Sequence, residues 1–89
     1  MTQQSTYDVT VFGASGYTGR LVCEYLEQRY GTTPLRWAMA GRSLSKLAAV
    51  REEMGIGNHV DLIEVDADSA DSVAAMVNNT SVVITSVGP

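Results

Sequence analysis

The stretch YDVTVFGASGYTGRL, residues 7–21, decides the fold of this 89-residue chain. It begins with β-branched and aromatic residues and then places glycines at Gly13, Gly16 and Gly19. A helical pattern starts at Tyr17. Glycine enters left-handed backbone regions at little steric cost and lets other groups come close to the main chain. The spacing therefore predicts a strand, a tight turn and a helix, in which Gly13 turns the chain, Gly16 faces a pyrophosphate and Gly19 packs the helix on the strand.

The same order of strand and helix repeats along the rest of the chain. Apolar runs predict strands at 7–12, 35–40 and 59–66, and a fourth strand that starts at Ser81 and stops at Gly88 and Pro89. Three- and four-residue spacings predict helices from Tyr17 to a cap at Gly31, from Ser43 or Ser45 to Met54, and from Asp68 or Asp71 to about Val77. Strict alternation implies parallel strands joined by right-handed crossovers. We therefore predict the α/β class, as a partial Rossmann-type doubly wound parallel sheet, β-α-β-α-β-α-β with strand order 3-2-1-4.

Side chains of the first helix predict how it packs. An apolar stripe is expected to face the sheet and consists of Leu21, Val22, Tyr25, Leu26 and Tyr30. Cys23 lies in the middle of the same helix, where a small buried thiol is commoner than a nucleophile. Trp37 is expected in the core of the second strand.

Composition excludes several function classes. The net charge of −4 argues against a general nucleic-acid surface, which needs clustered lysine and arginine. One cysteine cannot form an intrachain disulfide or a cysteine-based zinc site. The first residues, MTQQST, lack the features of a signal peptide, and no apolar run approaches the roughly 18–20 residues that cross a bilayer. We expect a cytoplasmic protein with no transmembrane segment and no metal site.

The glycine turn also predicts an anion site. The amides of residues 15–18 are expected to point outward at the helix N-terminus, where unpaired N–H groups and the helix dipole attract anions. The context of a strand before the turn and a helix after it favours a nucleotide. A purely structural turn is the alternative.

The end of the second strand separates the two nicotinamide cofactors, because an acidic residue there typically binds the ribose of NAD, whereas NADP needs a cation. Here the chain reads AGRSLSK, with no carboxylate between Met39 and Lys46. Arg42 can bind a phosphate bidentately, Ser43 offers a hydroxyl and Lys46 a second charge. This pattern favours NADP. The alternative is a solvated arginine, a helix cap and an exposed lysine.

Residues at the ends of the third and fourth strands complete the predicted site. Asp66 can accept a hydrogen bond from the adenine amino group or remain a loop carboxylate. Gly88 can allow close approach of the cofactor near the switch point of the sheet, or simply turn the chain. His59 is alone in its segment, and we assign it no catalytic role.

Three segments carry a family resemblance. VFGASGYTGRLV, WAMAGRSLSKL and the final SVGP resemble the N-terminal NADP-binding region of saccharopine dehydrogenase-like oxidoreductases, a group that includes trans-acting enoyl reductases. The resemblance covers about Tyr7 to Pro89. Because GASGYTG also occurs in N-acetyl-gamma-glutamyl-phosphate reductases, a semialdehyde-type reductase stays an alternative. A non-catalytic NADP-sensing module is another, since one fold serves both uses.

The resemblance implies a set of cofactor contacts. It places around the pyrophosphate Gly13, Ser15, Gly16, Tyr17, Thr18 and Gly19. It places Arg42 and Ser43 at the 2′-phosphate and Asp66 by the adenine. It also implies that residues 1–89 are the N-terminal half of a dinucleotide-binding domain, with the substrate domain and all catalytic residues elsewhere, so that this segment alone is inactive. We expect a homo-oligomer, formed through the exposed sheet edge or sheet face.

Overall fold

A computed structural model of the chain describes residues 6–30, 34–57 and 59–85. Its strands are β1 (Tyr7–Phe12), β2 (Trp37–Gly41), β3 (Asp61–Glu64) and β4 (Thr80–Thr85). Its helices are α1 (Tyr17–Tyr30), α2 (Leu44–Glu53) and α3 (Ala70–Asn78). All strand pairs are parallel and lie in the order β3-β2-β1-β4, so the predicted α/β sheet is confirmed.

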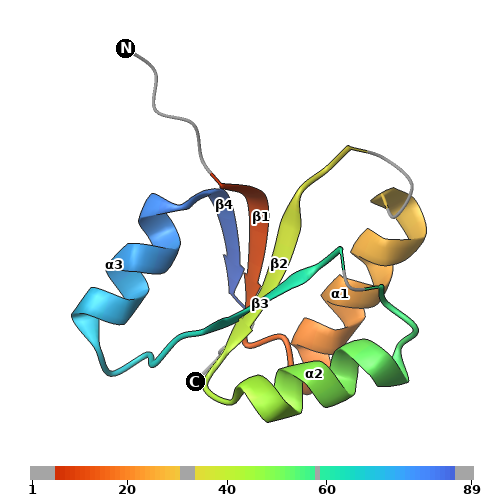
Figure 1. Ribbon diagram of the computed structural model, residues 1–89, viewed down its shortest axis with the longest axis horizontal. Coiled ribbons are helices and arrows are strands. Elements are labelled where there is room, and N and C mark those ends of the chain that lie inside the picture. Colours follow the sequence, from red (N-terminus) through yellow and green to blue (C-terminus); the bar gives the residue numbers. More distant parts are fainter. Residues whose placement is uncertain (1–5, 31–33, 58, 86–89) are drawn as a thin grey trace.

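Helices cover both faces of the sheet. Figure 1 shows α1 and α2 on one face and α3 on the other. This arrangement follows from right-handed crossovers, because the chain moves one way from β1 to β3 and the opposite way from β3 to β4. In the register, Phe12 is paired with Ala40 and with Thr85, so the carboxyl ends of the central strands meet at one edge. That edge is where open α/β sheets bind ligands.

The ends of some elements differ from the predictions. Helix α3 begins at a cap on Ser69, whose Oγ accepts from the amide of Ser72 at 3.3 Å, so the predicted acidic start is Asp71 and not Asp68. The physical reason is a turn just before the helix, in which Asp66 Oδ1 accepts from the amide of Asp68 at 2.9 Å. Asp71 lies in the first turn of α3. The predicted cap at Gly31 and the end of the fourth strand lie outside the described residues.

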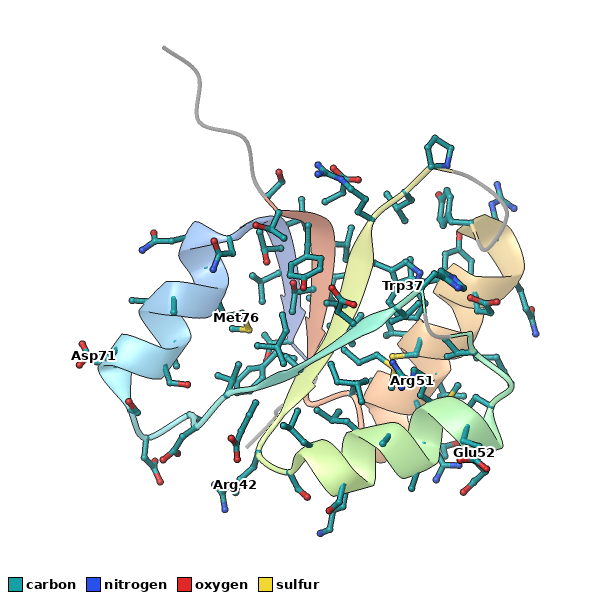
Figure 2. The ribbon with its side chains drawn as sticks, viewed as in Figure 1. Trp37, Arg42, Arg51, Glu52, Asp71 and Met76 are labelled. Carbon is teal, nitrogen blue, oxygen red and sulfur yellow. The ribbon has the colours of Figure 1, made fainter. Side chains whose placement is uncertain are left out.

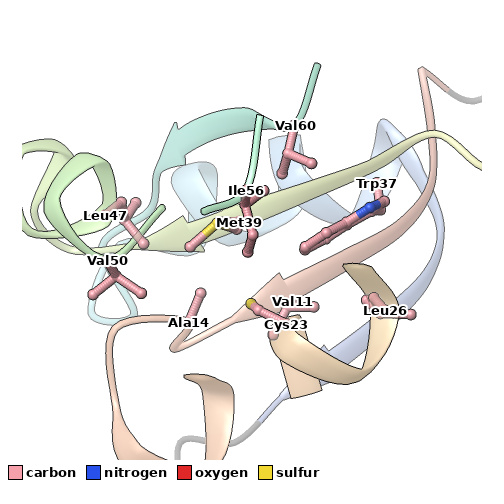
Figure 3. Packing of buried hydrophobic residues seen from close by; sticks show 10 residues of the cluster. All are labelled: Val11, Ala14, Cys23, Leu26, Trp37, Met39, Leu47, Val50, Ile56 and Val60. Atoms are coloured by element: carbon pink, nitrogen blue, oxygen red, sulfur yellow. The ribbon is translucent and has the colours of Figure 1, made fainter. Parts of the chain in front are cut away.

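Two hydrophobic cores hold the layers together. The larger core lies between the sheet and helices α1 and α2, and Figure 3 shows Val11, Trp37 and Met39 of the sheet facing Cys23 and Leu26 of α1. The smaller core lies under α3 and centres on Ala40, Val65 and Met76. The predicted burial of Cys23 and Trp37 is confirmed, at 0% and 2% exposed.

The packing face of α1 is narrower than the sequence predicted. Its buried residues are Gly19, Cys23 and Leu26, whereas Leu21 and Tyr25 are about half exposed. Tyr30 is also exposed, and Val22 packs partly against the core. Gly19 lies close to the backbone of the turn that follows β1, and this approach sets the rotation of α1. Leu21 and Tyr25 therefore lie on the side of the helix that faces solvent.

Gly19 makes the tightest backbone contact of the fold. A Cβ atom built on it would lie 2.1 Å from the carbonyl oxygen of Gly13 and 2.8 Å from the Cα of Ala14. Both neighbours are backbone atoms that no side-chain rotation can move. The predicted packing role of Gly19 is therefore confirmed.

No helix within the described ranges is both long enough and apolar enough to span a membrane.

We expect Gly19→Ala to lower the free energy of unfolding by about 2–3 kcal/mol, because the new methyl group forces α1 away from the turn. Denaturant unfolding measures this loss. Gly16→Ala is the matched control, since its Cβ would meet only the Gly13 oxygen at an ordinary 3.4 Å. The control should cost less than about 1 kcal/mol. Equal losses of unfolding free energy in Gly19→Ala and Gly16→Ala would contradict the packing role of Gly19.

Candidate functional site

The glycine turn after β1 is built on a single carbonyl of β2. Gly13 has a φ of 83°, a conformation that side chains rarely adopt, and this turns the chain sharply out of the strand. The amides of Gly13 and Ala14 both donate to the oxygen of Ala40, at 2.9 and 3.1 Å. The amide of Gly16 donates to Gly13 O at 3.0 Å, and Gly16 O accepts from Arg20 N at 2.9 Å. These bonds fix where α1 starts.

The same bonds decide which amides can bind a ligand. The sequence predicted that the amides of residues 15–18 all point outward, and this is wrong for Gly16, whose amide closes the turn. The first amides of a helix have no acceptor within the helix. Within the described residues, the amides of Ser15, Tyr17 and Thr18 have no hydrogen-bond acceptor. Gly16, Tyr17 and Thr18 are exposed at this helix end, so an anion can reach it.

A cavity of about 190 Å³ lies beside the turn, at the carboxyl ends of β1, β2 and β3. Three of the predicted residues line it, namely Gly13, Ser15 and Arg42. Its other walls were not predicted as site residues and are formed by Phe12, Gly41, Val65 and Ala67. Their common signal in the sequence is their position at or just after a strand end, but which side chain turns inward depends on the register. The glycine turn thus lies beside a cavity whose other walls are largely apolar.

Arg42 follows β2 directly and extends away from the sheet into solvent (Figure 2). Three other arginines of the described residues are engaged: Arg20 pairs with Glu53, Arg36 with Asp8, and Arg51 donates to Val60 O at 2.7 Å. Arg42 has no hydrogen bond or ion pair to any described residue. A guanidinium without a carboxylate partner, at the rim of a cavity, is available for a ligand anion.

Ser43 and Lys46 lie next to Arg42 at the start of α2. Ser43 is the N-cap, as one of the two predicted alternatives stated, and its Oγ accepts from the amide of Lys46 at 3.3 Å. Ser43 Oγ and Ser45 Oγ also form a hydrogen bond of 3.0 Å in which either hydroxyl can donate. The Ser43 proton is available to a ligand when Ser45 is the donor. The Lys46 side chain is exposed and has no ion pair among the described residues.

Two further predicted residues of the described ranges, Gly19 and Asp66, do not line the cavity. Gly19 is buried against the backbone of Gly13 and Ala14, directly after β1, and acts through packing. The carboxylate of Asp66 is exposed and accepts from Asp68 N, and the residues on either side of it line the cavity in its place. Gly88 lies outside the described residues. The contact of Asp66 with adenine and that of Gly88 with the cofactor stay predictions.

Other reactive groups do not form a second centre. Burial raises the pKa of the Cys23 thiol to about 12, so the nucleophilic thiolate is disfavoured. His59 Nε2 lies 3.5 Å from Glu27 Oε1, near the C-terminal end of α1, whereas the glycine turn precedes the N-terminus of this helix. In the described parts of the chain, no group of three or more His, Cys, Asp or Glu residues could hold a metal ion.

Comparison with known protein families assigns the chain. Residues 9–89 match the family model described as the saccharopine dehydrogenase NADP-binding domain. The chain belongs to this family. Its cofactor is therefore NADP, as the absence of an acidic residue after β2 had indicated.

Similar proteins are found in bacteria and animals. A trans-acting enoyl reductase of Mycobacterium leprae is 39% identical over 85 residues, which cover 93% of this chain and 20% of that protein. A saccharopine dehydrogenase-like oxidoreductase of Bos taurus is 35% identical over 99 residues, which cover 99% and 23%. A lipid droplet localized protein of Caenorhabditis elegans is 42% identical over 90 residues, covering 96% and 21%. The chain thus spans about a fifth of each relative.

A solved structure supports the fold alone. The crystal structure of 3-hydroxyacyl-CoA dehydrogenase type-2 from Mycobacterium avium has a TM-score of 0.65 with this chain. It is 20% identical, and the match covers 94% of this chain and 33% of that one.

We expect the Cys23 thiol of the folded chain to react with iodoacetamide at pH 8 more slowly than the unfolded chain in urea, by well over about tenfold. The reason is that a buried thiol with a raised pKa carries little thiolate and is not accessible. Mass spectrometry of the alkylated chain over time measures both rates. Similar rates in the two states would show that the thiol is reactive in the fold.

Proposed function

We propose that the carboxyl edge of this sheet binds NADP(H), with the 2′-phosphate at Arg42. The observation that carries the proposal is an exposed guanidinium with no described partner, beside a cavity and a turn with free amides. A phosphate monoester is the anion that best fits a bidentate guanidinium in this position. Ser43 and Lys46 add a hydroxyl proton and a second positive charge, and no carboxylate lies between residues 39 and 46 to bind an unphosphorylated ribose.

The glycine turn and the cavity beside it would supply the other contacts with the cofactor. The pyrophosphate would accept hydrogen bonds from the amides of Ser15, Tyr17 and Thr18, while Gly16 keeps side-chain atoms out of its path. The adenine ring would lie in the cavity against Phe12. Asp66 does not line this cavity but stands between two residues that do, Val65 and Ala67, and its Oδ2 would accept from the adenine amino group at the cavity's edge. The cavity is smaller than a typical ligand pocket, so it would hold one end of the cofactor, and the rest would extend past the turn toward the end of β4.

We further propose that this chain is the cofactor-binding part of a longer oxidoreductase. Bound NADPH supplies a hydride, and the residues described here orient the cofactor without contributing a catalytic group. The relatives that carry the names of reductases and oxidoreductases are about five times as long, which is consistent with a substrate domain outside these residues. The 89 residues alone would then bind cofactor and catalyse nothing. A semialdehyde-type reductase and a non-catalytic NADP sensor remain the alternatives.

Two further proposals concern the cellular location of the protein and its oligomeric state. A cytoplasmic location is supported by a buried, reduced cysteine, which suits a reducing compartment. A homo-oligomer is supported by the open sheet, whose outer strands each pair with a single neighbour within the described residues.

Substitution of Arg42 tests the cofactor assignment. We expect Arg42→Ala to weaken NADPH binding by about 1.5–3 kcal/mol, because one charge-assisted bidentate contact is lost, and to leave NADH binding nearly unchanged. Isothermal titration of the chain with each cofactor measures both affinities.

Arg36→Ala is the matched control for this experiment. Arg36 directly precedes β2, at the end of the strand opposite to Arg42, and pairs with Asp8. Its substitution should therefore change the affinity for neither NADPH nor NADH. Equal weakening of NADPH and NADH by Arg42→Ala would remove the 2′-phosphate assignment. Absence of binding to either cofactor in the unsubstituted chain would contradict the proposed function itself.

A further inference from the structure

The loop that joins β3 to α3 (Figure 1), residues 65–69, supplies part of the wall of the cavity beside the glycine turn. Val65 and Ala67 line the cavity, and Asp66 stands between them. Val65 is held by β2, because its amide donates to Gly41 O at 2.8 Å. The residues that follow Val65 leave the sheet, so hydrogen bonds within the loop and to α3 decide where they lie.

Asp66 is fixed by hydrogen bonds at its amide, its carbonyl group and its side chain. The amide donates to Ser72 Oγ at 3.0 Å, and the carbonyl oxygen accepts from the amide of Ser69 at 2.9 Å. Asp66 Oδ1 accepts from the amide of Asp68 at 2.9 Å. None of the other residues that the structure describes forms a hydrogen bond with Asp66 Oδ2. One carboxylate oxygen with a set direction is therefore left at the cavity's edge.

Ser72 is the partner of Asp66 that comes from a helix. It lies in the first turn of α3, and its own amide donates to the N-cap Ser69 Oγ at 3.3 Å. Helix α3 packs against the sheet through Met76, which is 3% exposed and contacts the smaller core at Val65. The Ser72 hydroxyl therefore ties the backbone of Asp66 to a helix whose own position is fixed by packing.

Charge at this loop favours the base of a nucleotide over its phosphate. The segment 65–72 contains Asp66, Asp68 and Asp71 and no lysine or arginine. Carboxylates repel a phosphate group, but they accept hydrogen bonds from the amino group of a base. Arg42, in contrast, is the cation among the residues that line the cavity. A nucleotide would therefore place its phosphate toward Arg42 and its base toward Asp66.

We propose that Ser72 is a positioning residue that, through Asp66, makes the site selective for adenine over 6-oxopurine bases. This inference rests on the proposed function and deepens it. Adenine carries an amino group at C6, which donates to Asp66 Oδ2. Hypoxanthine carries an oxygen at the same place, so two acceptors would face each other without a proton between them. Ser72 does not touch the base; it holds the acceptor in the direction that the amino group requires.

Isothermal titration of the 89-residue chain with NADPH and with its hypoxanthine analogue, deamino-NADPH, tests the proposal. The two ligands share their phosphates, riboses and nicotinamide, so the ratio of their dissociation constants isolates the contact with the base. We expect the unsubstituted chain to bind NADPH at least about tenfold more tightly than deamino-NADPH. In Ser72→Ala this preference should fall below about threefold, because the Asp66 amide loses its acceptor and the carboxylate is no longer held.

Ser69→Ala is the matched control for Ser72→Ala. It removes the N-cap of the same helix but leaves the Asp66 amide its acceptor, Ser72 Oγ. Denaturant unfolding should show a loss of stability, and the preference for NADPH over deamino-NADPH should stay that of the unsubstituted chain. A general loosening of α3 would instead lower the preference in both alanine variants, and this result would overturn the role of Ser72.

Asp66→Asn supplies a second test that does not depend on Ser72. The asparagine oxygen can still accept from the amide of Asp68, so an NH₂ group would replace Oδ2 at the cavity's edge. Because this group donates, the preference should reverse, with deamino-NADPH bound more tightly than NADPH. An unchanged preference in Asp66→Asn or in Ser72→Ala would contradict the inference.

The same titrations separate this inference from the proposed function. Equal binding of NADPH and deamino-NADPH by a chain that still prefers NADPH to NADH would overturn the adenine contact alone. The cofactor and the role of Arg42 would then stand. A chain that binds none of these dinucleotides would contradict the proposed function, and this inference with it.

Discussion

The contact between the backbones of Gly19 and Gly13 holds α1 against β1, and the rest of the structure depends on it. No Cβ fits between the two segments, so the helix lies closer to the strand than side chains would permit. That approach sets the rotation of α1, which buries Cys23 and Leu26 and exposes Leu21 and Tyr25. It also brings the N-terminus of α1 to the carboxyl edge of the sheet. Gly19 is thus a packing constraint, and the position of the proposed anion site follows from that constraint.

Ala40 O links this turn to the neighbouring strand. It accepts from both Gly13 and Ala14, which uses the amides that face the sheet and leaves those of Ser15, Tyr17 and Thr18 for a ligand. The same strand, β2, ends one residue later and places Arg42 at the rim of the cavity. In the proposed binding mode, one pair of hydrogen-bonded strands would therefore fix the positions of the pyrophosphate and the 2′-phosphate relative to each other. Selectivity for NADP would then depend on Arg42, the residue that directly follows β2.

Arg36 and Arg42 show how position, and not residue type, decides a role. Arg36 directly precedes β2 and Arg42 directly follows it, and both carry the same guanidinium group. Arg36 lies next to Asp8: the Arg36 backbone amide donates to Asp8 Oδ2, and the guanidinium pairs with Oδ1. These hydrogen bonds hold the pKa of Asp8 below its usual value. Arg42 has no described partner, because the carboxyl edge near it is lined by glycine, serine and apolar residues. Arg36 thus has a structural role, and Arg42 is the arginine to which we assign the anion in the proposed function.

The sequence by itself determined the class of fold, the strand order, the three glycine positions and the choice of NADP. These features depend on local patterns: alternation of strand and helix, glycine spacing, and the lack of a carboxylate between Met39 and Lys46. Only the tertiary structure decided the rotation of α1, the use of the Gly16 amide inside the turn, and the cavity walls at Phe12, Val65 and Ala67. It also decided that Asp66 closes a turn instead of lining the cavity. Each of these depends on contacts between segments far apart in the chain, and a local pattern holds no information about such distances.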